Sequence, residues 1–272
     1  MTIKELYEYG LSNLATDEKN TETVFLLEEA LGTDRKYLFS SNETEVCEEQ
    51  IQKFFEYIER RKNGEPVQYI VNKAYFYKFD FFVQKGVLIP RFDTENLVEK
   101  VLQYVKKGDR VLDVCTGSGC ILLSVMAETE GIEGTGSDIE DIALKTAEIN
   151  SERMGIKANF VKSNLFENIT GEFDVIISNP PYIEREVIAS LESQVREYEP
   201  FVALDGGEDG LDFYRRISKD ALKHLKKGGR LFFEIGYNQG ESVPRILEKD
   251  GYTDIQVSKD LCGNDRVVSA IR

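Results

Sequence analysis

The sequence is poor in the residues that build metal centres and disulfide frameworks. Its 272 residues include one histidine, four cysteines and no tryptophan. Cys47, Cys115, Cys120 and Cys262 form no CxxC pair and have no histidine close to them, which argues against a structural zinc site. A chain of this length also needs no disulfide framework. We therefore expect reduced thiols, a cytoplasmic protein and no bound metal.

Positive charge and long apolar runs are scarce as well. Lys and Arg number 34 against 49 Asp and Glu, so the formal net charge is −15. Nucleic-acid binding is driven largely by Lys and Arg that neutralise phosphates, so this balance disfavours a nucleic-acid-binding protein while leaving room for a small basic patch. No apolar run approaches the roughly 20 residues that span a bilayer, and the N-terminus lacks the form of a signal peptide. We expect a monomer without a membrane partner.

The first third of the chain changes from helical to extended patterning. Residues 1–62 carry three or four amphipathic patterns at helical spacing, and Asn42 with Glu45 resembles a capping box for the third. Residues 66–90 are rich in aromatic and β-branched side chains, which predicts a β-hairpin with its turn at residues 78–80. The proposed domains are a helical bundle for substrate or partner contact (1–70), a connecting hairpin (71–92) and a larger domain (93–272).

From Asp93 onward, strands alternate with helices. Asp93 is expected to cap a helix over residues 94–107. The alternation is typical of a mostly parallel α/β sheet covered by helices on both faces, and the last two strands, with no helix between them, are expected to be antiparallel neighbours. The seven expected strands cover residues 110–114, 134–137, 159–162, 174–178, 229–235, 254–258 and 266–271, and the helices between them residues 120–129, 139–154, 211–225 and 239–249.

The first candidate site is a glycine-containing turn that follows an apolar strand. The run Val111–Val114 leads into Cys-Thr-Gly-Ser-Gly at residues 115–119. Gly117 and Gly119 allow a positive φ and a close approach of the backbone. Such a turn at the carboxyl edge of a parallel sheet holds a nucleotide-like ligand, but it is neither a P-loop nor a good dinucleotide fingerprint. Taken alone, it is also compatible with a plain tight turn.

An acidic residue at the end of the next strand suits a ribose. Asp138 lies 19 residues after Gly119, and a carboxylate there can accept hydrogen bonds from two ribose hydroxyls. With a glycine turn but no phosphate signature, a nucleoside ligand such as S-adenosylmethionine is favoured over NAD. The alternative is that Asp138 caps the following helix, and the residues alone leave both interpretations open.

The most informative motif is Asn179-Pro180-Pro181-Tyr182, which follows the apolar strand at residues 174–178. The prolines stiffen the turn and leave its carbonyls free. Asn179 offers a side-chain carbonyl and Tyr182 a flat ring. Two carbonyl acceptors and a ring can hold a planar NH2 group and aim its lone pair at an electrophilic methyl. A rigid turn with Tyr182 packed inside is the alternative interpretation.

With these motifs in order, the chain resembles the bacterial peptide chain release factor N5-glutamine methyltransferases. The glycine turn followed by Asn-Pro-Pro-Tyr is shared by amino-group methyltransferases of nucleic acids and proteins that use S-adenosylmethionine. The flanking segments narrow the resemblance to this one family, from about residue 60 to the C-terminus. Those segments are residues 64–70, 86–95, 197–200, 204–211, 234–236 and 265–268.

The resemblance implies a Rossmann-like class I methyltransferase domain and a specific reaction. A methyl group would pass from S-adenosylmethionine, leaving S-adenosylhomocysteine, to the side-chain amide nitrogen of the glutamine in the Gly-Gly-Gln loop of class I release factors. The helical domain and hairpin would grip the release factor. Catalysis and substrate binding would fall to Asn179, Pro180, Pro181 and Tyr182. The cofactor would contact Cys115, Thr116, Gly117, Ser118, Gly119, Asp138, Leu165 and Asn179.

Three positions depart from the family pattern. Cys115 stands where glycine is common, so a positive φ there would carry strain; Asn164 replaces an acidic residue and Phe92 a proline.

The main alternative, a nucleic-acid adenine or cytosine N-methyltransferase with the same motif, is disfavoured by the charge of −15. A non-catalytic binding module would be expected to carry a damaged motif, and a dehydrogenase lacks both the fingerprint and an acid/base pair. No general base is evident.

Overall fold

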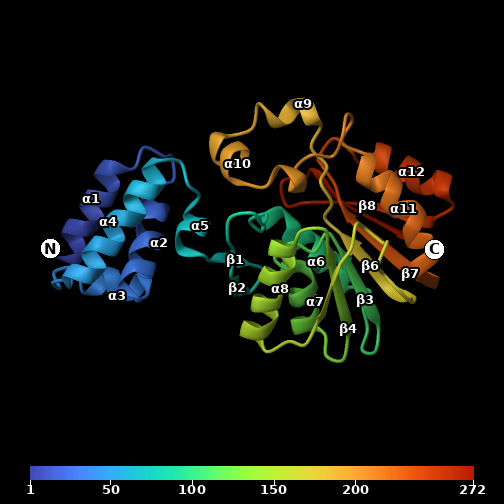
Figure 1. Ribbon diagram of the computed structural model, residues 1–272, viewed down its shortest axis with the longest axis horizontal. Helices are drawn as coiled ribbons and strands as arrows, with labels where there is room; N and C mark the ends of the chain where they lie inside the picture. Colours follow the sequence, from blue (N-terminus) through green and yellow to red (C-terminus); the bar gives the residue numbers. More distant parts are fainter. The chain divides into compact units, whose positions relative to one another are not determined.

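The computed structural model describes residues 1–272, which form two compact units. One unit comprises Met1–Lys73 with Ser193–Tyr198, and the other comprises Ala74–Glu192 with Glu199–Arg272. The first unit is helical, and the second is built on a twisted sheet (Figure 1). None of the helices combines the length and the apolar composition that crossing a membrane requires.

The helical unit is an amphipathic bundle. Its long helices bury one face each, and their side chains meet in a core that includes Leu6, Leu26 and Phe54. A buried ion pair fastens two of the helices, because Arg61 donates to both carboxylate oxygens of Glu22, at 2.8 and 3.0 Å. The elements are α1 (Ile3–Asn13), α2 (Lys19–Leu31), α3 (Arg35–Ser40), α4 (Glu48–Lys62), α5 (Val67–Val71) and α10 (Ser193–Tyr198).

The capping box expected at Asn42 and Glu45 is wrong. Helix α4 begins at Glu48, and its N-cap residue, Cys47, makes no side-chain capping bond. Residues 42–46 instead run beside the start of the chain, where Glu45 bridges Thr2. A capping box does exist, but it lies at the start of α1 and joins Thr2 to Glu5. Residues 42–46 do not begin the helix because their backbone pairs with residues 1–4, which are distant in sequence.

The hairpin is shorter than the aromatic and β-branched run that predicted it. Strands β1 (Ala74–Phe76) and β2 (Phe79–Phe81) pair antiparallel, and the turn between them is residues 77–78 and not 78–80, with Tyr77 at φ 59°. Residues Val67–Val71 form helix α5 and not a strand. Pro66 stands before its first turn, Asn72 ends it in the left-handed region, and its apolar side chains enter the helical core.

The larger unit contains the expected seven-stranded, mostly parallel sheet. Strand order is β5-β4-β3-β6-β7-β9-β8, and the first five strands in that order are parallel. β9 pairs antiparallel with β7 and with β8, which confirms the expected relation of the last two strands. The strands are β3 (Arg110–Val114), β4 (Glu133–Asp138), β5 (Asn159–Lys162), β6 (Phe173–Ser178), β7 (Leu225–Glu234), β8 (Thr253–Lys259) and β9 (Asp265–Ile271).

Helices cover both faces of the sheet, as Figure 1 shows. Alternate residues of one strand enter different cores: Leu231 and Phe233 face one cluster with α11 and α12, whereas Phe232 faces another with α6 and α7. This alternation explains why the strands read as continuous apolar runs. The covering helices are α6 (Glu95–Leu102), α7 (Cys120–Glu128), α8 (Asp141–Met154), α11 (Asp212–His224) and α12 (Ser242–Asp250).

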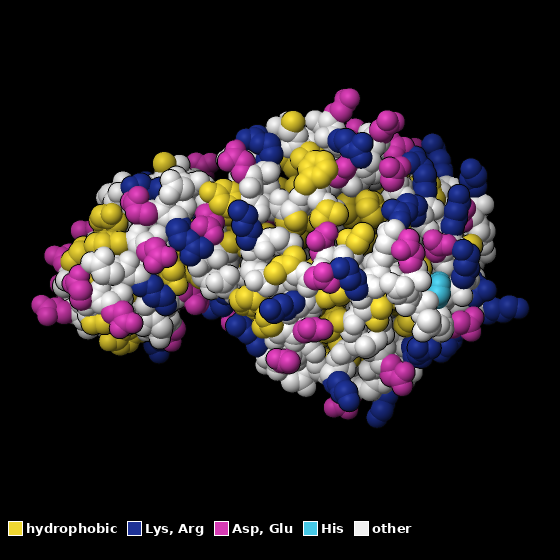
Figure 2. All heavy atoms as spheres, viewed as in Figure 1, with side chains coloured by type: hydrophobic (Ala, Val, Ile, Leu, Met, Phe, Trp, Pro, Cys, Tyr) yellow, Lys and Arg dark blue, Asp and Glu magenta, His cyan; other side chains and the backbone are white.

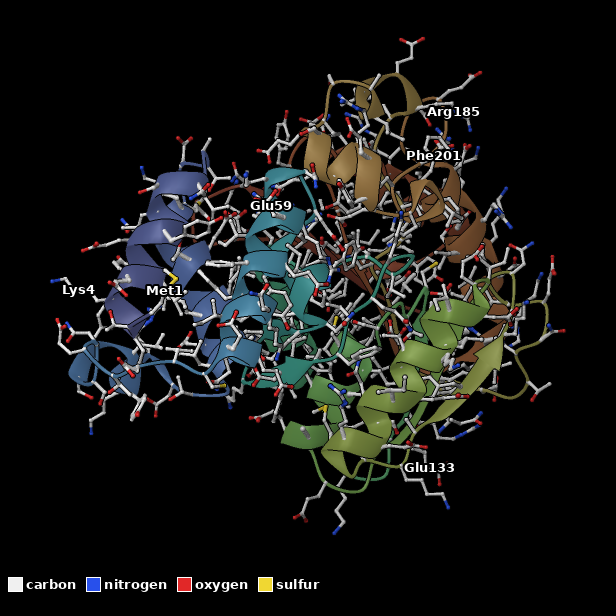
Figure 3. All side chains as sticks on the ribbon, turned by 60° about the vertical axis from the view of Figure 1, so that its left-hand side comes forward. Met1, Lys4, Glu59, Glu133, Arg185 and Phe201 are labelled. Atoms are coloured by element: carbon white, nitrogen blue, oxygen red, sulfur yellow. The ribbon has the colours of Figure 1, made fainter.

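One local feature of this unit differs from expectation, and one lies where no element was expected or excluded. Asp93 does not cap a helix: residues Phe92–Thr94 form a 3-10 turn, α6 starts at Glu95, and the Asp93 carboxylate lies 3.0 Å from Arg266 Nη2. The long connection between β6 and α11 contains the short helix α9 (Arg185–Ile188) and a 3-10 turn at Phe201–Ala203. Figure 3 labels Arg185 and Phe201, which belong to this connection.

Candidate active site

The site begins with the pairing of two neighbouring strands. Val114 at the end of β3 lies opposite Ser178 at the end of β6, and Ser178 Oγ donates to the Val114 carbonyl at 2.7 Å. The chain builds β4 and β5 on one side of β3, then returns to place β6 on the other side. Ligands of open α/β sheets bind outside the carboxyl ends of the strands at such a reversal point.

A cavity of about 210 Å³ lies at this edge of the sheet. Its wall is mostly apolar with a few polar groups, which is typical of small-molecule sites. Most of the predicted site residues meet here: Cys115, Thr116, Gly117, Ser118, Asp138, Leu165, Asn179 and Pro181 all line the cavity. Gly119, Pro180 and Tyr182 are not part of its wall.

The two glycines of the turn serve different purposes. Gly119 has φ 78° and precedes α7, and a Cβ at that position would lie 3.1 Å from the Ala147 side chain, so it is needed for helix packing. Gly117 has φ 56°, and a Cβ there would meet no protein atom within 4 Å. Since Gly117 lines the cavity, the space beside it is available to a ligand.

The turn is anchored by two acidic residues. Asp138 Oδ2 accepts from the Gly117 N–H at 2.9 Å, and its Oδ1 accepts from the Glu140 N–H at 3.0 Å. It ends β4, and the N-cap residue of α8 is Glu140, so Asp138 is not the helix cap. Beneath the turn, the Thr116 hydroxyl donates to fully buried Asp113 at 2.7 Å. Burial, aided by the charge of Asp138, raises the pKa of Asp113 to about 7.

Cys115 has the positive φ that, from its place in the family pattern, was expected to carry strain. Its φ is 63°, in the left-handed region that favours glycine. Burial raises the pKa of its thiol far above the usual range, so the sulfur stays protonated and is not a nucleophile. Leu165, also on the cavity wall, has φ 55°.

The structure also shows where the other two residues that depart from the family pattern, Asn164 and Phe92, lie. Asn164 lies on the cavity wall, but its side chain is engaged: Oδ1 accepts from Arg216 at 2.9 Å and Nδ2 donates to Glu167 at 2.8 Å. Phe92 is 73% exposed, so it takes no part in the core.

The Asn-Pro-Pro-Tyr loop is held at both ends. Asn179 Nδ2 donates to Thr94 Oγ1 at 3.3 Å. The Tyr182 hydroxyl donates to Glu234 Oε1 at 3.2 Å, and the Tyr182 carbonyl accepts from Gln239 Nε2 at 3.1 Å. Tyr182 thus packs against the core behind the loop, as the alternative interpretation of this residue held.

The sequence analysis predicted no role for several residues around the site. Glu234 is 1% exposed, and burial raises the pKa of its carboxyl to about 7. A charged residue within the apolar run at residues 231–235 was the signal that could have identified it. Arg91 pairs with buried Glu199, which joins the segment before α6 to the segment carrying Pro200 on the cavity wall.

The sequence matches two family models. Residues 5–71 match the PrmC N-terminal domain, and residues 91–194 match the methyltransferase small domain. The release factor glutamine methyltransferase of Clostridium acetobutylicum is 42% identical over 100% of this chain and 99% of its own length. That of Clostridium botulinum is 39% identical over 99% of both chains. A solved methyltransferase from Pyrococcus furiosus shares the fold, with TM-score 0.54 at 22% identity over 71% of this chain and 88% of that one.

The strain at Cys115 gives a prediction about stability. Cys115→Gly is expected to raise the free energy of unfolding by about 1 kcal/mol, because glycine adopts φ 63° without the steric cost borne by cysteine. Cys120→Gly is the matched control: Cys120 lies in α7, where glycine is unfavourable, so this variant is expected to lose at least about 1 kcal/mol. Urea unfolding of both variants measures the difference. A Cys115→Gly variant as destabilised as Cys120→Gly would contradict the assignment of strain.

Proposed function

The chain belongs to the family of release factor glutamine methyltransferases, and we propose that it methylates the side-chain amide nitrogen of the glutamine in the Gly-Gly-Gln loop of class I release factors. The observation that carries this proposal is one cavity lined by both the glycine turn after β3 and Asn179 after β6. A ligand held by the turn would therefore lie beside a group suited to holding an amide.

The residues of the cavity fit S-adenosylmethionine. Open space beside Gly117 accommodates a ligand against the backbone of residues 115–118, which would surround the methionine part. The Asp138 carboxylate would accept hydrogen bonds from the ribose hydroxyls, and Leu165 would lie beside the adenine. Gly119 contributes by letting the turn enter α7. When bound, this cofactor supplies an electrophilic methyl group on a sulfonium.

Asn179 is oriented to hold the substrate amide. Because its Nδ2 donates to Thr94, its Oδ1 is the atom left to accept a hydrogen bond from the glutamine NH2 group. By the resemblance, the Pro180 carbonyl would accept the second from outside the cavity wall, which Pro181 forms together with Asn179. An amide nitrogen is a poor nucleophile, and two preorganised acceptors would favour the charge it gains during transfer. Tyr182 holds the far end of the loop through Glu234 and Gln239.

The helical unit is proposed to contact the release factor, with the hairpin connecting the binding and catalytic parts. It corresponds to the match with the PrmC N-terminal domain at residues 5–71. On the face drawn in Figure 2, basic and acidic side chains are interspersed over this unit and form no basic groove. Together with the net charge of −15, this favours a protein substrate over the alternative of a nucleic-acid N-methyltransferase.

A methyl-transfer assay tests the proposed reaction. The protein is mixed with labelled S-adenosylmethionine and, separately, a class I release factor, the same factor with its Gly-Gly-Gln glutamine changed to alanine, DNA, and tRNA. We expect label on the unchanged release factor alone. Label on nucleic acid, or equal label on the alanine-bearing factor, would overturn the proposal.

The amide-holding role of Asn179 predicts a catalytic defect without a folding defect. Asn179→Ala removes the Oδ1 acceptor, and loss of one such preorganised group is expected to lower kcat by about 100-fold or more. Asn159→Ala, at an exposed position of β5, is the control and should keep full activity. Thermal unfolding checks that both variants remain folded. Full activity of Asn179→Ala would reject this role.

The ribose-binding role of Asp138 predicts weaker cofactor binding. Loss of hydrogen bonds to a charged acceptor is expected to raise the Kd for S-adenosylmethionine in Asp138→Ala by about 10- to 100-fold, as measured by calorimetry. Asp141→Ala removes a nearby carboxylate that pairs with Lys162 on the surface, and its Kd should match the unchanged protein. If Asp138→Ala bound the cofactor normally, Asp138 would have only the structural role of holding Gly117.

A further inference from the structure

Two consecutive arginines of α11 have different surroundings, and one of them lies on the wall of the cavity. Arg216 lines the cavity, whereas Arg215 does not, because successive residues of a helix point in different directions. Arg215 is bound to Asp209 and Asp212, whereas the Arg216 side chain donates to an amide oxygen and to no carboxylate. A guanidinium that keeps free donors at the wall of a ligand cavity is a candidate for recognising the ligand.

Two contacts hold the Arg216 guanidinium in place. Its Nη2 donates to Asn164 Oδ1 at 2.9 Å, and its central carbon lies 5.6 Å from the centroid of the Phe213 ring. Asn164 and Phe213 are themselves on the cavity wall. A guanidinium has five N–H donors, and the bond to Asn164 uses one of them. Donors therefore remain on Arg216 directly beside the Asn164 carbonyl oxygen.

The orientation of the Asn164 amide is set from both sides. Its Nδ2 donates to Glu167 Oε1 at 2.8 Å, and a carboxylate can only accept. Arg216 can only donate, so the atom of the amide that faces it is Oδ1. An acidic residue at position 164, which is common in the family pattern, would bring a second acceptor against Glu167. Asparagine suits both neighbours, and its carbonyl oxygen keeps a lone pair for a further donor.

Side by side, the Asn164 carbonyl and the Arg216 guanidinium offer one acceptor and one donor to the cavity. The Watson–Crick edge of adenine carries the complementary groups, a hydrogen on the N6 amino group and a lone pair on N1. Guanine and hypoxanthine carry them in reverse, an oxygen at position 6 and a hydrogen on N1. The two side chains therefore complement adenine and oppose the other two purines.

The register of the sheet places this pair beyond the proposed ribose-binding residue. Asp138 at the end of β4 lies opposite Lys162 at the end of β5, and Asn164 follows two residues later. The Watson–Crick edge of a nucleoside is the edge farthest from its sugar. With the ribose at Asp138, the N1 edge of the base, and not the N7 edge, would face Asn164 and Arg216.

We propose that Asn164 and Arg216 recognise the adenine of the cofactor, with Asn164 Oδ1 accepting from the N6 amino group and Arg216 donating to N1. The inference rests on the proposed function, because it takes the cavity to hold S-adenosylmethionine. It adds two specificity-determining side chains to Leu165, which the resemblance places beside the adenine. Glu167 acts on the base only through Asn164 and is a positioning residue.

Calorimetry with S-adenosylhomocysteine and three analogues tests this assignment without any methyl transfer. For the unchanged protein, we expect the Kd to rise about 30-fold or more with S-inosylhomocysteine, in which hypoxanthine reverses both groups. The 1-deaza analogue lacks the N1 lone pair, and its Kd should be about tenfold higher than that of S-adenosylhomocysteine. The 7-deaza analogue should bind within about twofold of S-adenosylhomocysteine, since N7 makes no contact in this arrangement.

Substitutions at the two arginines link the effect to one side chain. In Arg216→Ala, the Kd for S-adenosylhomocysteine should rise about tenfold, and the 1-deaza analogue should bind no more weakly than S-adenosylhomocysteine does. Arg216→Lys keeps the charge but not the planar fork that serves Asn164 and N1 together, so it should behave like Arg216→Ala. Arg215→Ala is the matched control and should bind all four ligands like the unchanged protein. Thermal unfolding checks that the three variants remain folded.

The acceptor role of Asn164 has its own variant. Asn164→Leu removes the oxygen that distinguishes an amino group from a carbonyl at position 6 of the purine. Its preference for S-adenosylhomocysteine over S-inosylhomocysteine should fall about tenfold relative to the unchanged protein. An unchanged preference would overturn the role of Asn164.

The outcomes separate this inference from the proposed function. The inference is overturned, and the function stands, if the unchanged protein methylates the release factor but binds the 1-deaza or inosine form as tightly as S-adenosylhomocysteine. The same holds if Arg216→Ala keeps the 1-deaza penalty, if Arg216→Lys binds like the unchanged protein, or if only the 7-deaza analogue binds weakly. If the ligands bind as expected but no release factor is methylated, the proposed function is overturned and the adenine contacts stand. Binding of none of the four ligands would overturn both.

Discussion

The pairing of β3 with β6 is the constraint on which the site depends. Two loops 60 residues apart in sequence become neighbours only because Val114 and Ser178 are in register at the carboxyl edge of the sheet. A slip of one residue would turn every side chain of a strand to the opposite face, and both faces are filled by separate apolar cores. The cores therefore hold the register, and the register holds the glycine turn beside Asn179.

Buried acids are the second organising feature. Asp113 lies under the glycine turn and Glu234 behind the Asn-Pro-Pro-Tyr loop, and burial raises the pKa of each to about 7. Burying a carboxylate is unfavourable unless it is hydrogen-bonded, and neither is fully satisfied here, since Asp113 Oδ1 and Glu234 Oε2 have no hydrogen-bond partner. Each acid accepts a hydrogen bond from a hydroxyl group and thereby holds a loop in place. Asp113 holds the glycine turn through Thr116, and Glu234 holds the Asn-Pro-Pro-Tyr loop through Tyr182.

Much of the larger unit was predictable because its local and tertiary requirements agree. The strands at residues 110–114 and 159–162 have the predicted bounds, since runs filling two cores carry an unambiguous pattern. The errors fall where a distant partner decides. Residues 67–71 have β-branched composition but form α5 against the helical core, and Asp93 has the chemistry of a cap but pairs with Arg266. Short-range propensity is a weak determinant beside such contacts.

By itself, the sequence determined the chemistry available at the site: a stiff Asn-Pro-Pro-Tyr turn after an apolar strand, a glycine turn after another, and an acid 19 residues further on. It also carried the family, because these motifs keep their order. Only the tertiary structure decided which atoms face the cavity. It turned Tyr182 toward the core, where its hydroxyl donates to Glu234, held Cys115 at a positive φ, and placed Thr94 beside the Asn179 amide. Hydrogen-bond direction depends on partners from distant segments, and no local pattern records where those partners will lie.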